Sequence, residues 1–537
     1  MCFLSPSFRN GKGGERPIGI FPSFVRVISR IIRYKYGRFW LQQNDRPFLY
    51  GRKGRSALQC VWRQAAICEH ATYLGKVAIA ILIDIIKAFD SVEHSVLFRN
   101  ALKYNFSFNI LRYLLSLYKT RLIVVQGVAT TFVKATRSIV PGDSNADVLM
   151  TLAMLSAIDS MVQQIEVFPA VLADDVQFLA VGTSSECVAI AEQASSILIS
   201  ELEGEAMLAI STSKLMCISN SPSILGKFAR RAPRFREAKV ASGRNLGVDF
   251  AAGKPITRAV QKGRLKESKK RAKRLRQVKK AGGNVKTIVR TNLHACARYG
   301  VQVVGMLPSL LAGHRSDIHA ALVDKPKGWS RTIDVMLGDR FTDPTYDCLV
   351  APIVFFLAML WNQSLPRDMI FRAWSTAVFK VDHGLTWKQA IGPFAIAALA
   401  FQKIGWKHTS LVRWIRPCQM FVDISALDPM TIEQMLNDDV QLMLFNSAKP
   451  NHTGYEQIQG LPFFGPINGL IRSKPTVDWT KQHQAMLRCI VADGCWPLQR
   501  LQTAGYVTDG LCVCGTLQDA KHAAWECALT APGTRVE

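Results

Sequence analysis

The chain has 537 residues, about half of them apolar, with 67 Lys and Arg against 40 Asp and Glu. This length and apolar content exclude one small domain and a globally disordered chain, and they predict roughly three or four compact units. The formal net charge of +27 indicates a polyanionic partner, because Lys and Arg gain affinity by releasing counterions condensed on phosphates. Many basic proteins bind no nucleic acid specifically, so charge alone leaves the partner open.

Cysteine usage and the length of the apolar runs indicate an intracellular protein. The 13 cysteines are an odd number and mostly stand singly, which is not the pattern of a secreted disulfide framework. The first residues lack the charged region and long apolar core of a signal peptide. The runs 349–361 and 390–401 are too short to span a bilayer and predict buried core helices. We therefore expect a location in the nucleus or cytoplasm and no membrane partner.

The first half of the chain alternates helical and strand patterns. Residues 24–40 place basic and apolar residues at helical spacing, which predicts an amphipathic helix whose basic face is either a binding surface or merely solvated. Residues 77–86 form an aliphatic run typical of a buried strand, and a helical stretch follows over 92–118. The apolar run 168–181 is interrupted by two acids, which predicts a hairpin with carboxylates at its tip.

A helix over 186–203 and a strand over 206–219 complete this pattern. Strand, helix, hairpin, helix and strand in this order indicate an α+β fold rather than a doubly wound sheet.

The composition changes over residues 254–290, where basic residues crowd one predicted helix. Such a helix is unsuited to a core, and we favour a nucleic-acid contact over a solvated tail. The residues expected to bind nucleic acid are Lys266, Lys269, Lys270, Arg271, Lys273 and Arg274. From 308 to 475 the sequence is apolar and helical, without chemistry that the residues reveal.

Acids at the ends of apolar strands carry the chemical signal. Asp84 ends one predicted strand, and Asp174 and Asp175 lie in the turn of another. Buried carboxylates are costly unless a cation or a partner satisfies them, and a single one is more often a cap or an ion-pair member. Two such sites favour metal binding, because nucleotidyl transfer uses two Mg²⁺ ions roughly 3.5–4 Å apart, held by converging carboxylates.

These residues resemble the reverse transcriptases of non-LTR (LINE-type) retrotransposons. The stretch 83–92 is similar to the family's acid followed by Lys-Ala-Phe-Asp, and 172–175 to its aromatic-Ala-Asp-Asp hairpin, with Leu in the aromatic place. The other matching segments, in the family's order, are Arg16-Pro17-Ile18, Val140-Pro141-Gly142-Asp143-Ser144, Ser213-Lys214 and Asn245-Leu246-Gly247-Val248. The resemblance covers about residues 16–250, and the basic helix falls where a thumb belongs.

The resemblance implies a right-hand polymerase and a role for each matching residue. Asp84, Asp174 and Asp175 would be the catalytic Mg²⁺ ligands, with two ions bound, and Lys214 would protonate or stabilise the leaving pyrophosphate. The nucleotide-binding residues would be Arg16 at the triphosphate, Phe89 excluding a 2′-hydroxyl and Gly142 against a base. The alternatives are a local carboxylate contact for Arg16, a core aromatic for Phe89, a simple turn for Gly142 and a surface lysine for Lys214.

Two departures from the family pattern affect these expectations. Pro141 stands where the family has Gln, and Ser144 where it has Pro, so template handling is expected to differ. The chain also starts almost at the fingers motif, which is the pattern of a truncated or decayed copy.

A Cys/His signal lies near the end of the chain, at Cys512, Cys514, His522 and Cys527. Three thiolates and an imidazole suit a closed tetrahedral zinc site; free buried cysteines are the alternative. The segment resembles the zinc-binding module that follows many retrotransposon polymerases, including Asp519 and Trp525 around the histidine. This implies one structural Zn²⁺ and a role in holding nucleic acid.

The sequence therefore predicts fingers and palm over 1–220, a primer-grip hairpin and basic thumb over 221–307, a helical connection over 308–480 and a zinc module over 481–537. The expected activity is RNA-directed DNA polymerisation, with an RNA template, a DNA primer and dNTPs as partners. The alternatives are an inactive nucleic-acid-binding remnant, a group II intron maturase-like polymerase and an RNA-dependent RNA polymerase. The aromatic at 89 argues against use of ribonucleotides.

Overall fold

The chain folds into two compact units in a computed structural model. The residues that the structure describes are 2–6, 17–125, 128–129, 131–322, 330–337, 342–451, 455, 458–494, 496–519, 522, 526–527 and 529. The first unit comprises Met1–Thr257 with Gln389–Gly392, and the second Arg258–Lys388 with Pro393–Glu537. The boundary expected at residue 220 falls inside the first unit, and the four-part division remains a prediction.

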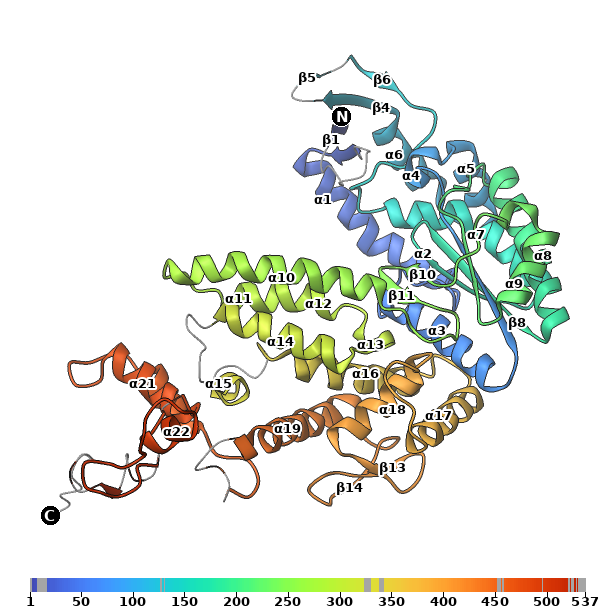
Figure 1. The fold of residues 1–537 in the computed structure, drawn as a ribbon. Coiled ribbons are helices and arrows are strands. Elements are labelled where there is room, and N and C mark those ends of the chain that lie inside the picture. The colour runs from blue at the N-terminus through green and yellow to red at the C-terminus, as the bar shows by residue number, and fades with distance from the viewer. Residues whose placement is uncertain are drawn as a thin grey trace. The chain divides into compact units, whose positions relative to one another are not determined.

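A four-stranded antiparallel sheet forms the centre of the first unit (Figure 1). Its strands, in spatial order, are β7 (Phe168–Leu172), β8 (Asp175–Gly182), β3 (Val77–Ile83) and β9 (Met216–Ser219). The aliphatic run of β3 is central and buried on both sides, as its composition predicts. The expected hairpin is confirmed, with Leu172 paired to Asp175 across a two-residue turn.

Helices cover both faces of this sheet. Side chains on one face of the sheet, including Ile79, Ile81 and Phe178, pack in the main core with α7 (Ala146–Gln164) and α8 (Ser184–Ser200). A capping box at Thr183 and Glu186 starts α8. On the other face, Cys60 of α3 (Ala57–Tyr73) packs against Ala170 of β7. The sheet is therefore a rigid platform, and its strand ends are held from two sides.

The predicted amphipathic helix is confirmed as a continuous helical segment. It consists of α1 (Ser23–Ile32), a π-helical turn η1 (Arg33–Gly37) and α2 (Arg38–Gln43). A second sheet is formed by strands that precede and follow this segment in the sequence. Its strands are β1 (Cys2–Pro6), β2 (Pro17–Ile20), β4 (Thr120–Val125), β5 (Val128–Ala129) and β6 (Val133–Lys134). The remaining helical elements of this unit are α4 (Ala88–Ser91), α5 (His94–Lys103), α6 (Phe108–Lys119), η2 (Glu201–Glu205), α9 (Pro222–Arg231) and η3 (Pro233–Phe235).

Two local structures refine the sequence prediction. The strand expected over 206–219 begins only at Met216, because Ser211 and the next three residues form a turn, where Ser and Thr favour local hydrogen bonds over a ladder. Lys214 therefore lies in this turn and not in a strand. Residues 243–250 form the hairpin of β10 (Gly243–Asn245) and β11 (Val248–Phe250), whose turn residues Leu246 and Gly247 both have positive φ, as a type I′ turn requires.

The second unit is mainly helical. The basic helix α10 (Ala259–Lys280) packs along α14 (Pro308–Leu322), as Figure 1 shows. The other helical elements are α11 (Lys286–Ile288), η4 (Val289–His294), α12 (Ala295–Arg298), α13 (Val301–Val304), α15 (Arg331–Leu337), α16 (Pro344–Trp361), α17 (Arg367–Asp382), α18 (Pro393–Ile404), α19 (Pro429–Ala448), η6 (Lys449–Asn451), α20 (Gly465–Arg472), α21 (Lys481–Val491) and α22 (Leu498–Thr503).

A small sheet interrupts the region expected to be wholly helical. It consists of β12 (Lys407–His408), β13 (Arg413–Ile415) and β14 (Phe421–Asp423). Strands of two or three residues are too short to show an alternating pattern, which is why the sequence does not predict them. The buried Trp414 anchors the middle strand on Trp374 and Phe401.

Within the described part of the chain, two helices are long and apolar enough to cross a membrane by length and composition alone, Ala146–Gln164 and Pro344–Trp361. The second is longer than the apolar run 349–361 suggested, because it begins at Pro344 with Asp343 as its cap. In each helix 61% of the apolar window is buried within the protein, as in a core helix.

Candidate functional site

The structure brings the predicted acids of two separate β-elements to one end of the central sheet. Strand β3 ends at Ile83, which is paired with Val176 of β8, so Asp84 follows at the level of Asp175. Asp174 lies in the adjoining turn beside Ala173, whose φ of 54° is a left-handed conformation that non-glycine residues rarely adopt. The hairpin therefore holds its two acids against the end of β3, at some backbone strain.

Lys214 joins this group through an ion pair. Its Nζ lies 2.9 Å from Oδ2 of Asp84, and the side chains are 61% and 31% exposed. The backbone fixes the turn that carries Lys214, because the amide of Ser211 donates to the carbonyl of Asp84 at 2.8 Å. A bridge between Ile85 and Ile210 continues this pairing. The lysine that the resemblance singles out is thus held beside the first acid, 130 residues away in sequence.

The three carboxylates do not form a closed ligand cage. Among the described residues, Asp84, Asp174 and Asp175 do not form a group whose ligand atoms all lie within 4.8 Å of one another. Such a group is formed instead by the Cys and His residues near the C-terminus. The Asp84 carboxylate is directed to the Lys214 ammonium. A divalent cation at Oδ2 of Asp84 would compete with this ammonium.

A buried polar relay connects the acidic hairpin with the β10–β11 hairpin. Gln177, two residues after Asp175, accepts a hydrogen bond from Nδ2 of Asn245 at 2.5 Å. The Gln177 amide donates to Sγ of Cys60 in α3 at 2.9 Å. Burial raises the pKa of the Cys60 thiol to about 12, so the sulfur stays neutral. In the sequence, Gln177 is distinguished only as a polar residue within an otherwise apolar strand.

The nucleotide-binding candidates are placed in different ways. Phe89 is partly buried and packs against the main core, and its carbonyl accepts from the amide of Ile139 at 2.7 Å. Gly142 is exposed with φ of 103°, a conformation suited to glycine. The loop is tied to β2, since Gly19 donates to the carbonyl of Pro141 at 2.8 Å. Arg16 lies outside the described residues.

Asp143 of the same loop has a structural partner. It is buried and accepts a hydrogen bond from the hydroxyl of Tyr118. It also accepts from the amide of Asn145 at 3.1 Å. The loop is therefore fixed on the protein side, while Gly142 stays accessible.

The basic helix α10 has one inner face and one solvent face. Gln261, Ser268, Ala272 and Leu275 are buried at helical spacing. Arg271, although partly exposed, donates to Oδ1 of Asn292 at 2.8 Å and also pairs with Glu267. The predicted contact residues on the solvent side are Lys266, Lys269, Lys270, Lys273 and Arg274.

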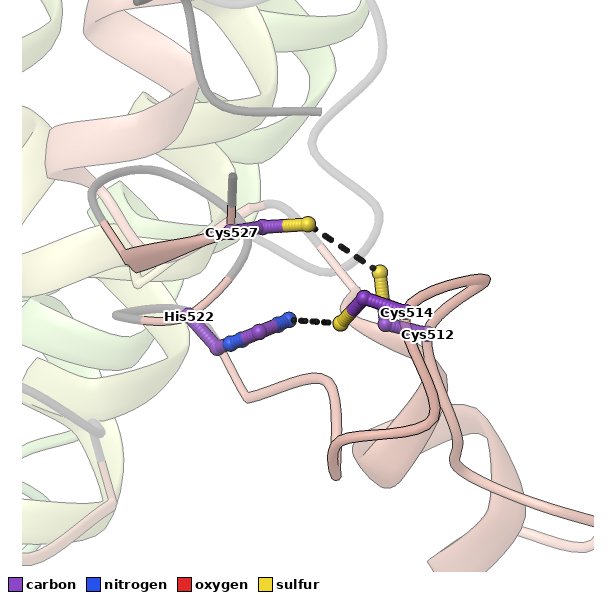
Figure 2. A group of neighbouring side chains, drawn as sticks. All are labelled: Cys512, Cys514, His522 and Cys527. Atoms are coloured by element: carbon purple, nitrogen blue, oxygen red, sulfur yellow. Dashed lines mark hydrogen bonds between the residues drawn. The ribbon is translucent and has the colours of Figure 1, made fainter. Parts of the chain in front are cut away.

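Cys512, Cys514, His522 and Cys527 come together at the C-terminus (Figure 2). The sulfur atoms of Cys512 and Cys527 are 3.5 Å apart, and Cys514 Sγ is 3.1 Å from His522 Nε2. Ligands about 2.0–2.3 Å from a tetrahedral zinc ion lie roughly 3.3–3.8 Å from one another. The Cys512–Cys527 distance falls in this range and the Cys514–His522 distance is slightly shorter, and three thiolates with one imidazole within 4.8 Å are a donor set that suits zinc.

The turn around Cys514 favours the form that binds metal. Hydrogen bonds from the backbone and side chain of Thr516 lower the pKa of the Cys514 thiol. Gly515, with φ of 84°, closes the turn by donating to the carbonyl of Cys512. Oδ1 of Asp519 accepts from the amide of His522 at 2.6 Å, which orients the histidine loop. Trp525 lies outside the described residues.

The family match to known proteins lies within the first unit. Residues 8–248 match the family model described as reverse transcriptase (RNA-dependent DNA polymerase), which is somewhat less than half of the chain. None of the curated proteins compared with the chain matches it.

Two telomerase structures are among the solved structures with similarity to this chain. Apo telomerase from Candida tropicalis, truncated from the C-terminal domain, has a TM-score of 0.31 and 13% identity over 45% of this chain and 51% of that chain. Telomerase from Candida albicans, in complex with a TWJ fragment of telomeric RNA, has a TM-score of 0.36 and 10% identity over 72% of this chain and 65% of that chain. The chain thus spans about half the length of the first and 65% of the second. The family match identifies residues 8–248 as a reverse transcriptase domain, the nucleotidyltransferase domain of RNA-directed DNA polymerases.

Proposed function

We propose that the chain is an RNA-directed DNA polymerase of the non-LTR retrotransposon type, which adds deoxynucleotides to a primer 3′ end on an RNA template. The observation that carries this proposal is the placement of the Asp174–Asp175 turn against the end of β3 at Asp84. Carboxylates from two strands at one sheet end are what two-metal nucleotidyl transfer requires. The family match over residues 8–248 supports the same reaction class.

The chain's own residues have distinct tasks in this reaction. Asp84, Asp174 and Asp175 would hold two Mg²⁺ ions, which supply charge neutralisation at the attacking and leaving oxygens. Lys214 exchanges its contact with Asp84 for the incoming triphosphate and gives a proton to the leaving pyrophosphate. Phe89 excludes a 2′-hydroxyl from the sugar position.

The remaining proposed contacts surround this centre. Gly142 lets a base approach the backbone, and Arg16 pairs with the triphosphate. We assign residues 1–220 to fingers and palm, 221–307 to the primer-grip hairpin and thumb, 308–480 to a connection and 481–537 to a zinc module. The Cys512, Cys514, His522 and Cys527 side chains would hold one structural Zn²⁺.

A catalytically inactive remnant is the second candidate. Pro141 and Ser144 favour it, because they replace residues that the family uses beside template and nucleotide. Such a protein would retain RNA binding through α10 and lack primer extension.

The decisive experiment is Mg²⁺-dependent extension of a DNA primer on RNA by the full chain and by Asp174→Ala. Loss of several kcal/mol of transition-state stabilisation corresponds to about a thousand-fold slower extension. Glu166→Ala is the matched control, since it removes an exposed carboxylate from the same unit. We expect the control to extend like the wild type and to prefer dNTPs over NTPs. Equal rates for wild type and Asp174→Ala would reject the site, and a folded wild type without extension would establish the remnant.

A further inference from the structure

A basic cavity lies in the second unit, at the end of the basic helix. It has a volume of about 320 Å³, and three cationic side chains line it, those of Lys279, Lys286 and Arg488. The rest of its wall is the turn 282–285 and Leu322, and no carboxylate is among the described residues that line it. Positive side chains around one cavity repel one another, and Asp334 offsets only the charge of Arg488, so an anion that enters the cavity is attracted by the two lysines.

The turn between Lys279 and Lys286 is built to bring these two lysines together. Gly282 has φ of 86°, and a Cβ on Gly283 would lie 2.6 Å from Cγ1 of Val278. The amides of both glycines donate back to the end of α10, at 2.9 Å each. Because the amides of Gly282 and Gly283 donate within the turn, an anion in the cavity would be bound by side chains rather than by these two amides. Glycine at both positions is what allows the chain to reverse here.

Arg488 comes from α21, about two hundred residues further along the chain, and a buried acid orients it. Its Nε donates to Oδ1 of Asp334 at 2.5 Å, and Asp334 is only 1% exposed. The second oxygen of Asp334 is hydrogen-bonded to His319, which is also buried. The guanidinium is therefore held in one orientation at the cavity wall, which lowers the entropic cost of binding.

We propose that this cavity binds a phosphate group. A guanidinium and two ammonium groups, with no acid among the described lining residues, match a tetrahedral oxyanion better than a neutral or cationic ligand. The phosphate is either one of a nucleic-acid strand lying along α10 or a free phosphate such as inorganic pyrophosphate. The first source deepens the proposed function and rests on it, because it adds an oriented anchor to the exposed lysines of α10. The second source is independent of strand binding.

The test compares Lys279→Gln/Lys286→Gln with Lys403→Gln/Lys474→Gln, a control that removes two exposed charges from the same unit outside the cavity. Single-stranded RNA of 20 nucleotides is titrated by fluorescence anisotropy over a salt series, and inorganic pyrophosphate by calorimetry. Thermal melting checks that both double variants fold. Arg488→Lys keeps the charge and the contact with Asp334 but lacks the fork, so it should weaken binding less than the double variant.

For a strand phosphate, the cavity variant should lower the slope of log K against log salt by about 0.7, the contribution of one phosphate contact with a single strand. For a free phosphate, the cavity variant should lose pyrophosphate binding and leave RNA affinity at the level of the control. Either result supports the cavity as a phosphate site. Unchanged binding of both probes relative to the control would overturn it.

The same experiment separates this inference from the proposed function. Asp174→Ala should lose extension and keep both binding activities, since Asp174 is not among the residues that line the cavity. A wild type that does not bind RNA would contradict the proposed function and the strand phosphate, while the pyrophosphate titration would still decide the cavity.

Discussion

Replacing Lys214 by Gln separates a catalytic lysine from a merely structural one. The ion pair with Asp84 joins side chains that are 61% and 31% exposed, so solvent screens most of its attraction. Exposed pairs of this kind contribute about 0–1 kcal/mol, and the free energy of unfolding should fall by no more than that. Glutamine has nearly the same length and can still donate a hydrogen bond, but it carries no proton to transfer.

The catalytic effect should be far larger than the structural one. A positioned general acid contributes about 10²–10⁴-fold, so we expect extension to slow by at least about a hundred-fold in Lys214→Gln. The assay is single-turnover incorporation of one dNTP by rapid quench, with urea unfolding in parallel.

Lys227→Gln serves as the matched control, because Lys227 is exposed on α9 in the same unit. Incorporation by Lys214→Gln within about three-fold of this control would refute proton donation by Lys214. A decrease of several kcal/mol in the free energy of unfolding would show that the Lys214–Asp84 ion pair has a structural role.

Three further changes have defined outcomes. Asn245→Ala leaves Oε1 of Gln177 buried without its donor, so urea unfolding should show a loss of about 1–3 kcal/mol; an unchanged midpoint would mean that the relay contributes nothing. His314 is buried, neither of its ring nitrogens has a hydrogen-bond partner among the described residues, and burial lowers its pKa to about 4. The unfolded chain protonates the His314 imidazole near pH 6.5, and the folded chain does so only near pH 4. As the pH falls across that interval, the free energy of unfolding should therefore decrease by up to about 3 kcal/mol, and His314→Leu should remove most of this decrease. Equal acid sensitivity in both proteins would contradict the reasoning. Elemental analysis of the purified chain should find about one zinc, which Cys514→Ser should largely abolish; a full equivalent in the variant would exclude Cys514 as a ligand.

The sequence predicts the centre of the first unit well, for a physical reason. Acids at the ends of aliphatic strands are costly without partners, so Asp84 and the 174–175 turn could be found from pattern alone. Alternation and composition place these residues on strands, and the structure pairs those strands as neighbours. The hairpin at residues 243–250 was expected only from the family resemblance, and the positive φ angles at its Leu246-Gly247 turn came from the structure.

Long-range partners escaped prediction because no local pattern encodes them. Gln177 gains its meaning only when Asn245 and Cys60 fold against it. Likewise the basic helix was evident from composition, but Arg488 joins Lys279 only through the packing of α21 in the second unit. The turn that holds Lys214 was mistaken for a strand, since apolar residues flank it on both sides.

The most direct test of the account is a double-mutant cycle at the two strand ends, with single-turnover extension measured for Asp84→Asn, Asp174→Asn and the double variant. Two carboxylates that serve one metal-binding centre act as a unit, so the double variant should be hardly slower than either single variant. Losses that multiply in the double variant, or extension retained after either single change, would show that the two acids do not share a catalytic centre.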